Sequence, residues 1–144
     1  MILYCDTSAL VKRYIEEEGT AEVDALWDKA IEVTTSTVAY AEGMAAFSRK
    51  RREGVISRSG YTRAVATFNE EHLSFVLVQI SPQLNVIIKR LIEKYPLRGF
   101  DAIHLASALI VKESLTDVVF ACFDKGLNRA AKRENMKMVF EGVS

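Results

Sequence analysis

The sequence has few of the residues that mark several classes of protein. Its 144 residues include only two cysteines, two prolines and seven glycines. Two cysteines are too few for the disulfide framework of a small secreted protein. The scarcity of proline and glycine argues against a disordered or linker-rich chain. We therefore expect a single domain over residues 1–144, long enough to bury a core.

Net charge and long apolar runs are absent as well. The 19 basic and 19 acidic side chains cancel, so the overall positive charge typical of nucleic-acid-binding domains is missing. The most apolar stretch, residues 102–111, is too short to span a membrane and contains a histidine. The N-terminal segment has no basic region ahead of its apolar residues, as a signal peptide would. These features predict a cytoplasmic protein without a membrane segment.

Short runs rich in β-branched or aromatic residues alternate with longer stretches of helical periodicity. This alternation is typical of βαβ units and predicts an α/β fold with a parallel sheet. The expected strands are residues 2–5, 32–35, 75–78, 118–122 and 137–140. The expected helices are residues 8–17, 21–30, 38–53, 57–72, 100–114 and 125–134, with a further helix that begins at Ser81-Pro82. Gly54 is expected to end the helix before it.

Four acidic residues stand apart from the rest, most of which have charged neighbours. Asp6, Glu42 and Asp101 are each the only charged residue in a long uncharged segment, and Asp124 ends the uncharged run 118–123. A carboxylate in a buried segment is costly unless it is paired, hydrogen-bonded or bound to a metal. Each of the four therefore needs a partner.

The positions of these acids suggest a shared site. Asp6 and Asp124 follow expected strands, and the carboxyl ends of parallel strands face one crevice where ligands bind. Glu42 and Asp101 lie near the beginnings of expected helices. Oxygen ligands without a cysteine or histidine cluster suit a hard cation such as Mg²⁺ or Mn²⁺, which can activate water against a phosphate. Helix capping is the alternative for the three aspartates, but it does not explain Glu42, which lies inside its helix.

With its residues laid out in this way, the sequence resembles the PIN-domain ribonucleases, and among them the VapC-type toxins of type II toxin-antitoxin systems. The segments that carry the resemblance are residues 4–11 (YCDTSALV), 41–43 (AEG), 97–106 (LRGFDAIHLA) and 122–127 (CFDKGL). The acids are 36, 59 and 23 residues apart, as in that family. The resemblance covers essentially the whole chain.

The resemblance implies a three-layer α/β/α sandwich around a parallel five-stranded sheet. It implies that Asp6, Glu42, Asp101 and Asp124 are the catalytic acids and bind Mg²⁺ or Mn²⁺. Ser8 and Arg98 would contact the substrate, which is a structured RNA such as transfer RNA or ribosomal RNA. The implied activity is metal-dependent hydrolysis of RNA phosphodiester bonds. The implied partners are a cognate VapB-type antitoxin and a second copy of the chain in a homodimer.

Three points stay open at the level of the sequence. The basic run from Arg49 to Arg52 could contact phosphates or could form a solvated helix end. His104, on an otherwise apolar helix, is interpreted as a buried structural histidine rather than a ligand. A non-catalytic PIN-type module that binds RNA or protein is the alternative function, because fold alone does not fix activity. The complete set of acids favours catalysis.

Overall fold

Five parallel strands form one sheet in the computed structural model, which describes residues 1–138. The strands are β1 (Ile2–Cys5), β2 (Glu32–Ser36), β3 (Val76–Val78), β4 (Val118–Ala121) and β5 (Lys137–Met138), in the order β3-β2-β1-β4-β5. Every pair of neighbours is parallel. The predicted parallel sheet is confirmed, and the part of the last expected strand beyond residue 138 lies outside the described residues.

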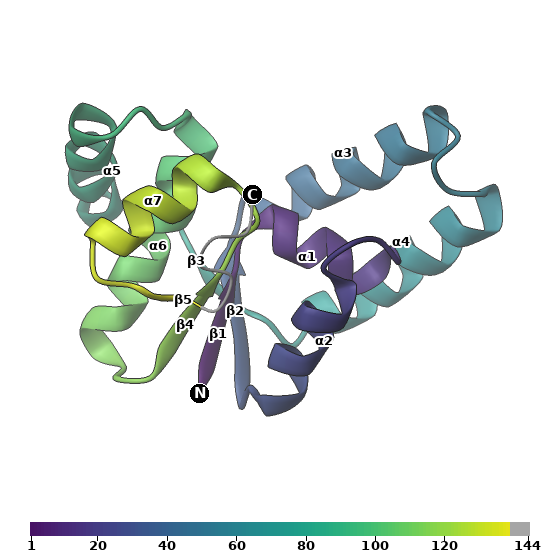
Figure 1. The fold of residues 1–144 in the computed structure, drawn as a ribbon, viewed down its shortest axis with the longest axis horizontal. Helices are drawn as coiled ribbons and strands as arrows, with labels where there is room; N and C mark the ends of the chain where they lie inside the picture. The colour runs from purple at the N-terminus through teal and green to yellow at the C-terminus, as the bar shows by residue number, and fades with distance from the viewer. Residues whose placement is uncertain (139–144) are drawn as a thin grey trace.

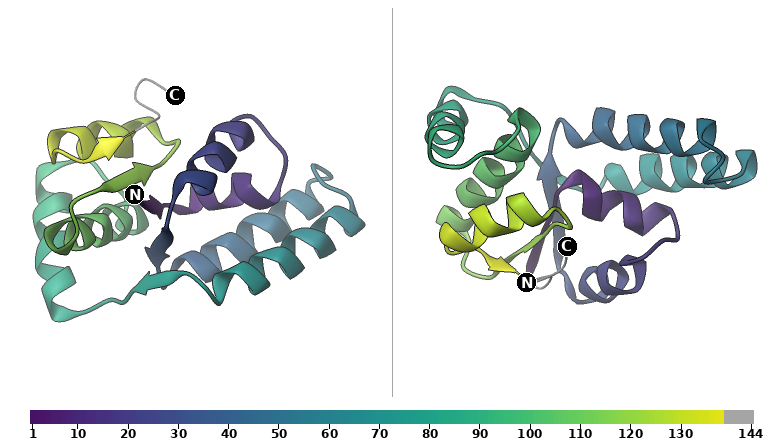
Figure 2. Two further views of the ribbon diagram at one scale, coloured as in Figure 1. Left: turned by 90° about the horizontal axis from the view of Figure 1, so that it is seen from below. Right: turned by 45° about the horizontal axis from the view of Figure 1, so that its top comes forward.

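Seven helices in the described chain cover both faces of this sheet. They are α1 (Thr7–Tyr14), α2 (Thr20–Lys29), α3 (Ala39–Arg52), α4 (Arg58–His72), α5 (Pro82–Lys94), α6 (Gly99–Ser114) and α7 (Lys125–Arg133). Helices α1 to α4 lie on one side of the sheet and α5 to α7 on the other (Figure 1, Figure 2). The predicted three-layer α/β/α sandwich is therefore confirmed.

Both faces of the central strands are buried, with alternate residues facing opposite layers. Leu3 and Val119 belong to the cluster packed under α1 to α4, whereas Tyr4 and Phe120 belong to the cluster under α5 to α7. Burial on both faces explains why the strands are continuous apolar runs rather than alternating ones. This packing fixes the carboxyl ends of β1 and β4, where the predicted site begins.

Two helix boundaries follow the local signals in the sequence. At the end of α3, the N–H of Val55 donates to the carbonyl of Lys50 (2.8 Å) and that of Gly54 to Arg51 (3.1 Å). Gly54 has φ of 72°, so this is a Schellman motif, which favours glycine at this position. Helix α5 begins with the hydroxyl of Ser81 accepting from the N–H of Leu84 (3.1 Å).

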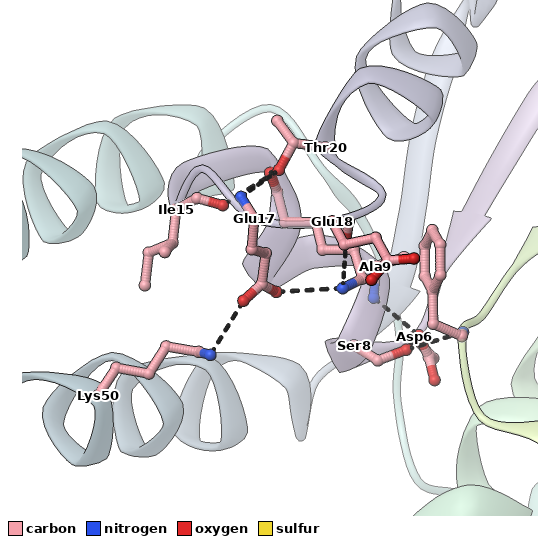
Figure 3. Close-up of polar contacts among 10 residues, drawn as sticks. Asp6, Ser8, Ala9, Ile15, Glu17, Glu18, Thr20 and Lys50 are labelled. Atoms are coloured by element: carbon pink, nitrogen blue, oxygen red, sulfur yellow. Dashed lines mark hydrogen bonds and ion pairs between the residues drawn. The ribbon is translucent and has the colours of Figure 1, made fainter. Parts of the chain in front are cut away.

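Helix α1 is shorter than predicted, ending at Tyr14 instead of residue 17. The hydroxyl of Thr20 lies between the carbonyls of Lys12 (2.9 Å) and Ile15 (3.2 Å), and it accepts from the N–H of Glu17 (3.0 Å), as Figure 3 shows in part. A side chain from the next helix thus binds the free carbonyls of the last turn. The helix ends early because this contact turns the chain back toward α2.

Two sequence-based expectations concern the chain as a whole. Among residues 1–138, no helix combines the length and the apolar character that crossing a bilayer requires. The prediction of a single domain over all 144 residues stays a prediction, because the last six lie outside the described part.

Candidate active site

Asp6 lies directly after β1 and caps helix α1. Its N–H donates to the carbonyl of Ala121 in β4 (3.1 Å), and its Oδ1 accepts from the hydroxyl of Ser8 (2.7 Å) and the N–H of Ala9 (3.0 Å), as Figure 3 shows for the side chain. The residue is only 5% exposed. Burial raises the pKa of this carboxyl above its ordinary value, against the lowering effects of His104 and these hydrogen bonds.

Asp6 forms no ion pair with lysine or arginine inside the described part of the chain. An ionised carboxylate buried without a cation is costly. Such a side chain is stabilised when a cation binds beside it, so Asp6 is both a helix cap and a candidate ligand for a metal ion.

Ser8 joins the beginning of α1 to the segment after β4. Its hydroxyl donates to Asp6 and accepts from the N–H of Phe123 (3.1 Å). Because the Ser8 hydroxyl is held by both hydrogen bonds, it positions the Asp6 carboxylate. Contact between Ser8 and a substrate stays a prediction.

Glu42 lies on α3 and is held from two other elements. Its Oε1 accepts from the hydroxyl of Thr7 (2.7 Å) and lies 2.9 Å from Nε2 of His104 on α6. Nδ1 of His104 lies 2.9 Å from the hydroxyl of Tyr4 in β1. Burial alone would raise the pKa of Glu42, but the hydrogen bonds with His104 and Thr7 outweigh it and hold the pKa below its ordinary value.

His104 is buried, at 2% exposure, as the sequence suggests. The sequence reasoning missed that its partner is a candidate catalytic acid. The available signal was the spacing from Asp101 to His104, because residues three apart lie on one face of a helix. That spacing places the histidine on the side of α6 that carries the predicted site.

Asp101 lies in the first turn of α6, where a negative charge is favoured by the helix dipole. The N-cap is Arg98 and makes no side-chain capping bond, so Asp101 is not the cap of this helix. Its Oδ2 lies 3.4 Å from Nε of Arg98, whose side chain is 85% exposed. The pair is therefore an exposed contact, which contributes little to stability.

Asp124 is the N-cap of α7. Its side chain accepts from the N–H of Leu127 (2.8 Å), and its own N–H donates to Sγ of Cys122 (3.3 Å). The capping explanation thus accounts for Asp6 and Asp124 but not for Glu42 or Asp101.

A groove of about 790 Å³ passes the predicted site. Thr7, Ser8, Glu42, Asp101 and Arg98 line it, and the lining also includes three basic side chains, those of Lys12, Arg49 and Lys50. Glu17 joins two of these bases, with Oε1 at 3.2 Å from Lys12 and Oε2 at 3.0 Å from Lys50 (Figure 3). The groove therefore places carboxylates, which bind cations, next to cations, which bind phosphates.

The acids do not form a closed ligand cage in this arrangement. Within residues 1–138, no group of three or more histidine, cysteine, aspartate or glutamate side chains is arranged to hold a metal ion. Asp6 and Glu42 are fixed by hydrogen bonds, whereas Asp101 is held only by its contact with exposed Arg98. Asp101 is thus the acid with the greatest freedom to change its position.

Fold and groove together define an α/β protein with carboxylates at the carboxyl edge of a parallel sheet. The model of the PIN domain matches residues 3–133. Ribonuclease VapC45 of Mycobacterium tuberculosis is 31% identical over 130 residues, which are 90% of this chain and 89% of that protein. The chain belongs to the PIN domain family.

Solved structures share the fold at low sequence identity. The complex VapBC2 from Rickettsia felis, bound to a DNA fragment from its promoter, has a TM-score of 0.67 at 12% identity and covers 96% of this chain and 98% of that one. The sarcin-ricin loop cleaving toxin VapC20 of Mycobacterium tuberculosis has a TM-score of 0.62 at 16% identity, with coverage of 89% and 94%. These structures match the architecture described above.

Proposed function

We propose that this protein is a metal-dependent endoribonuclease and the toxin of a toxin-antitoxin pair. The relationship to a ribonuclease of the VapC type, over nine-tenths of the chain, supports the activity. The observation that carries the proposal is the buried carboxylate of Asp6 beside a groove that Glu42 and Asp101 line. No nucleophile from the protein is required.

The donors are of the chemical type that Mg²⁺ and Mn²⁺ bind, because hard cations prefer carboxylate oxygens. Asp6, Glu42 and Asp101 would hold the ion, and Asp124 would serve mainly as the cap of α7, at the edge of the site. Such an ion supplies a water molecule of lowered pKa and offsets negative charge at the phosphate. Burial of Asp6 without an ion pair to lysine or arginine in the described part of the chain is the feature that agrees with a bound cation.

The residues of the chain would orient the catalytic carboxylates and bind the phosphates of the substrate. Asp6 is fixed through Ser8 and Ala9, and Glu42 through Thr7 and His104, so both carboxylates are oriented before a substrate arrives. Arg98 and Lys50, which both line the groove, would bind phosphates of the nucleotide chain. The nucleotide chain would therefore lie along the groove.

The substrate we propose is a structured RNA, such as transfer RNA or ribosomal RNA, in the cytoplasm. The solved toxin VapC20, which cleaves the sarcin-ricin loop, agrees with this class of substrate. A VapB-type antitoxin is the proposed protein partner, in line with the VapBC2 complex. A homodimer is proposed as the assembly of the toxin itself.

Incubation of the purified protein with total RNA and Mn²⁺ tests the activity. We expect discrete fragments that disappear when a chelator is added and return with excess Mn²⁺. Asp6→Asn protein, purified in the same way, controls for contaminating ribonuclease and should give no fragments. If the wild-type protein cleaves no RNA with Mn²⁺ or with Mg²⁺, the proposal fails and the non-catalytic binding module takes its place.

A further inference from the structure

We propose that Tyr4 and His104 position Glu42 through a directed chain of hydrogen bonds that fixes Oε1 and leaves Oε2 for the groove. This inference rests on the proposed function, since it assigns a task to a side chain of the same site. It makes His104 a positioning residue, which acts through Glu42 rather than on the substrate.

Three secondary-structure elements meet at one carboxylate oxygen. The chain starts at the hydroxyl of Tyr4, which is fully buried in the centre of the sheet. It continues through both ring nitrogens of His104, each 2.9 Å from its partner, to Oε1 of Glu42. The hydroxyl of Thr7 donates to the same oxygen from α1 (2.7 Å). Glu42 is thus tied to β1, α1 and α6 at the same time.

The geometry gives the chain a direction. Because Oε1 of Glu42 accepts from Thr7, the nitrogen of His104 beside it must donate a proton to be favourable. The neutral Nε2–H tautomer and the imidazolium ion both meet this requirement, whereas the Nδ1–H tautomer does not. Nδ1 lies 2.9 Å from the hydroxyl of Tyr4, and this contact fixes the orientation of the ring.

The two oxygens of Glu42 are consequently in different situations. Oε1 receives both hydrogen bonds, and within residues 1–138 Oε2 receives none. Glu42 lines the groove beside Asp101. Fixing one oxygen prevents rotation of the carboxylate and holds the other at a constant place in the groove. Partners that orient a ligating or catalytic group in this way are typically worth about 10-fold to 100-fold in metal affinity or activity.

The alternative is a purely structural role, in which the chain only satisfies buried polar groups of Tyr4 and His104. Both roles predict loss of stability when His104 is replaced. Only the positioning role predicts that the effect of replacing His104 on Mn²⁺ binding and kcat depends on the presence of Glu42. The test must therefore separate these two readouts.

The first experiment requires neither metal nor activity. Long-range ¹⁵N spectra of the metal-free protein at neutral pH report the protonation of each ring nitrogen, and the chain contains only two histidines, His72 and His104. Loss of one signal set in His104→Gln assigns the spectrum. We expect a protonated Nε2 for His104. A bare Nε2, as in the Nδ1–H tautomer, would overturn the directed chain.

The second experiment is a double-mutant cycle between His104→Leu and Glu42→Gln. We expect His104→Leu to weaken Mn²⁺ binding and to lower kcat by about 10-fold to 100-fold, and Tyr4→Phe to have a smaller effect in the same direction. His104→Gln, whose amide can donate to Glu42, should restore most of the loss. In a Glu42→Gln background, His104→Leu should change neither quantity further. If the two substitutions instead act independently, so that their fold-changes in Mn²⁺ affinity and kcat multiply in the double mutant, the inference is overturned.

His72→Leu is the matched control, because His72 packs against Tyr40, Phe68 and Phe75 away from Glu42. It should leave Mn²⁺ affinity and kcat within about two-fold, and thermal unfolding of every variant reports the structural cost. If the wild type neither binds Mn²⁺ nor cleaves RNA, the proposed function fails while the ¹⁵N spectra still test the chain. If the wild type is active and the cycle is multiplicative, the positioning inference fails alone.

Discussion

We call Asp6 and Glu42 the inner part of the candidate site and Asp101 with Arg98 its outer part, and the side chains of the two parts are held differently. The inner carboxylates, Asp6 and Glu42, each accept two hydrogen bonds at one oxygen from donors on ordered helices. The outer pair, Asp101 and Arg98, is joined by a single contact of 3.4 Å beside solvent. Groups that take part in a reaction benefit from being fixed in advance, whereas groups that bind a large flexible substrate benefit from freedom to adapt. The difference suggests that chemistry depends on the inner part and that binding depends on the outer part.

Among the variants of the two parts, Asp6→Asn should have the largest effect on RNA cleavage. We expect cleavage of RNA to fall by roughly 10³-fold or more, because the variant loses the buried charge that would hold the cation. Asparagine caps helices as well as aspartate, so the fold should remain. A gel assay of a defined RNA measures the rate. Cleavage at the wild-type level would remove Asp6 from the site.

The unfolding temperature of the same variant should differ from that of the wild type in its dependence on Mn²⁺. The pKa of Asp6 is raised in the folded protein, so stability that is present below the unfolded pKa is lost as pH rises through the folded pKa. Without divalent ions at neutral pH, Asp6→Asn should therefore unfold at an equal or higher temperature than the wild type. Mn²⁺ should raise the unfolding temperature of the wild type only. Equal stabilisation of both proteins would place the ion elsewhere.

Asp101→Asn examines the outer acid with an equally conservative change. We expect a loss of about 10²-fold in kcat, smaller than for Asp6, since the half-buried carboxylate of Asp101 is more easily replaced by water than the buried one of Asp6. The unfolding temperature should not change, because the contact with Arg98 is exposed. A loss as large as that of Asp6→Asn would show that the inner and outer acids act as one unit.

The sequence predicts the backbone and the identity of the acids better than the contacts between them. The strands, the Gly54 helix end and the positions of Asp6 and Asp124 depend on local patterns, and they agree with the structure to within a few residues. The contact of Glu42 with His104 joins residues 62 apart in the chain. It depends on how α3 and α6 pack across the edge of the sheet, which periodicity does not encode. The early end of α1 escaped prediction for the same reason, because Thr20 belongs to another helix.

Replacement of Asp124 tests whether this acid belongs to the inner part or serves as a cap. Asp124→Ala removes the acceptor for the N–H of Leu127, so the free energy of unfolding should fall by about 1 kcal/mol. Asp124→Asn keeps the cap and should change it by only a few tenths of a kcal/mol. Denaturant titration measures both, and we expect cleavage by both to stay within about ten-fold of the wild type. A much larger loss of cleavage in Asp124→Asn, with normal stability, would make Asp124 a ligand.

Arg98→Ala and Lys50→Ala should have the smallest effects and should act on binding. We expect KM to rise by about three-fold to ten-fold with kcat nearly unchanged, because the two side chains would contact phosphates rather than the reacting atoms. Each lost contact with a single-stranded segment should reduce the slope of log affinity against log salt by about 0.7. Arg52→Ala, at the exposed end of α3 and outside the groove lining, is the control and should leave the slope unchanged. A loss of kcat in Arg98→Ala would mean instead that this exposed arginine orients Asp101, and the outer part would then share in the chemistry.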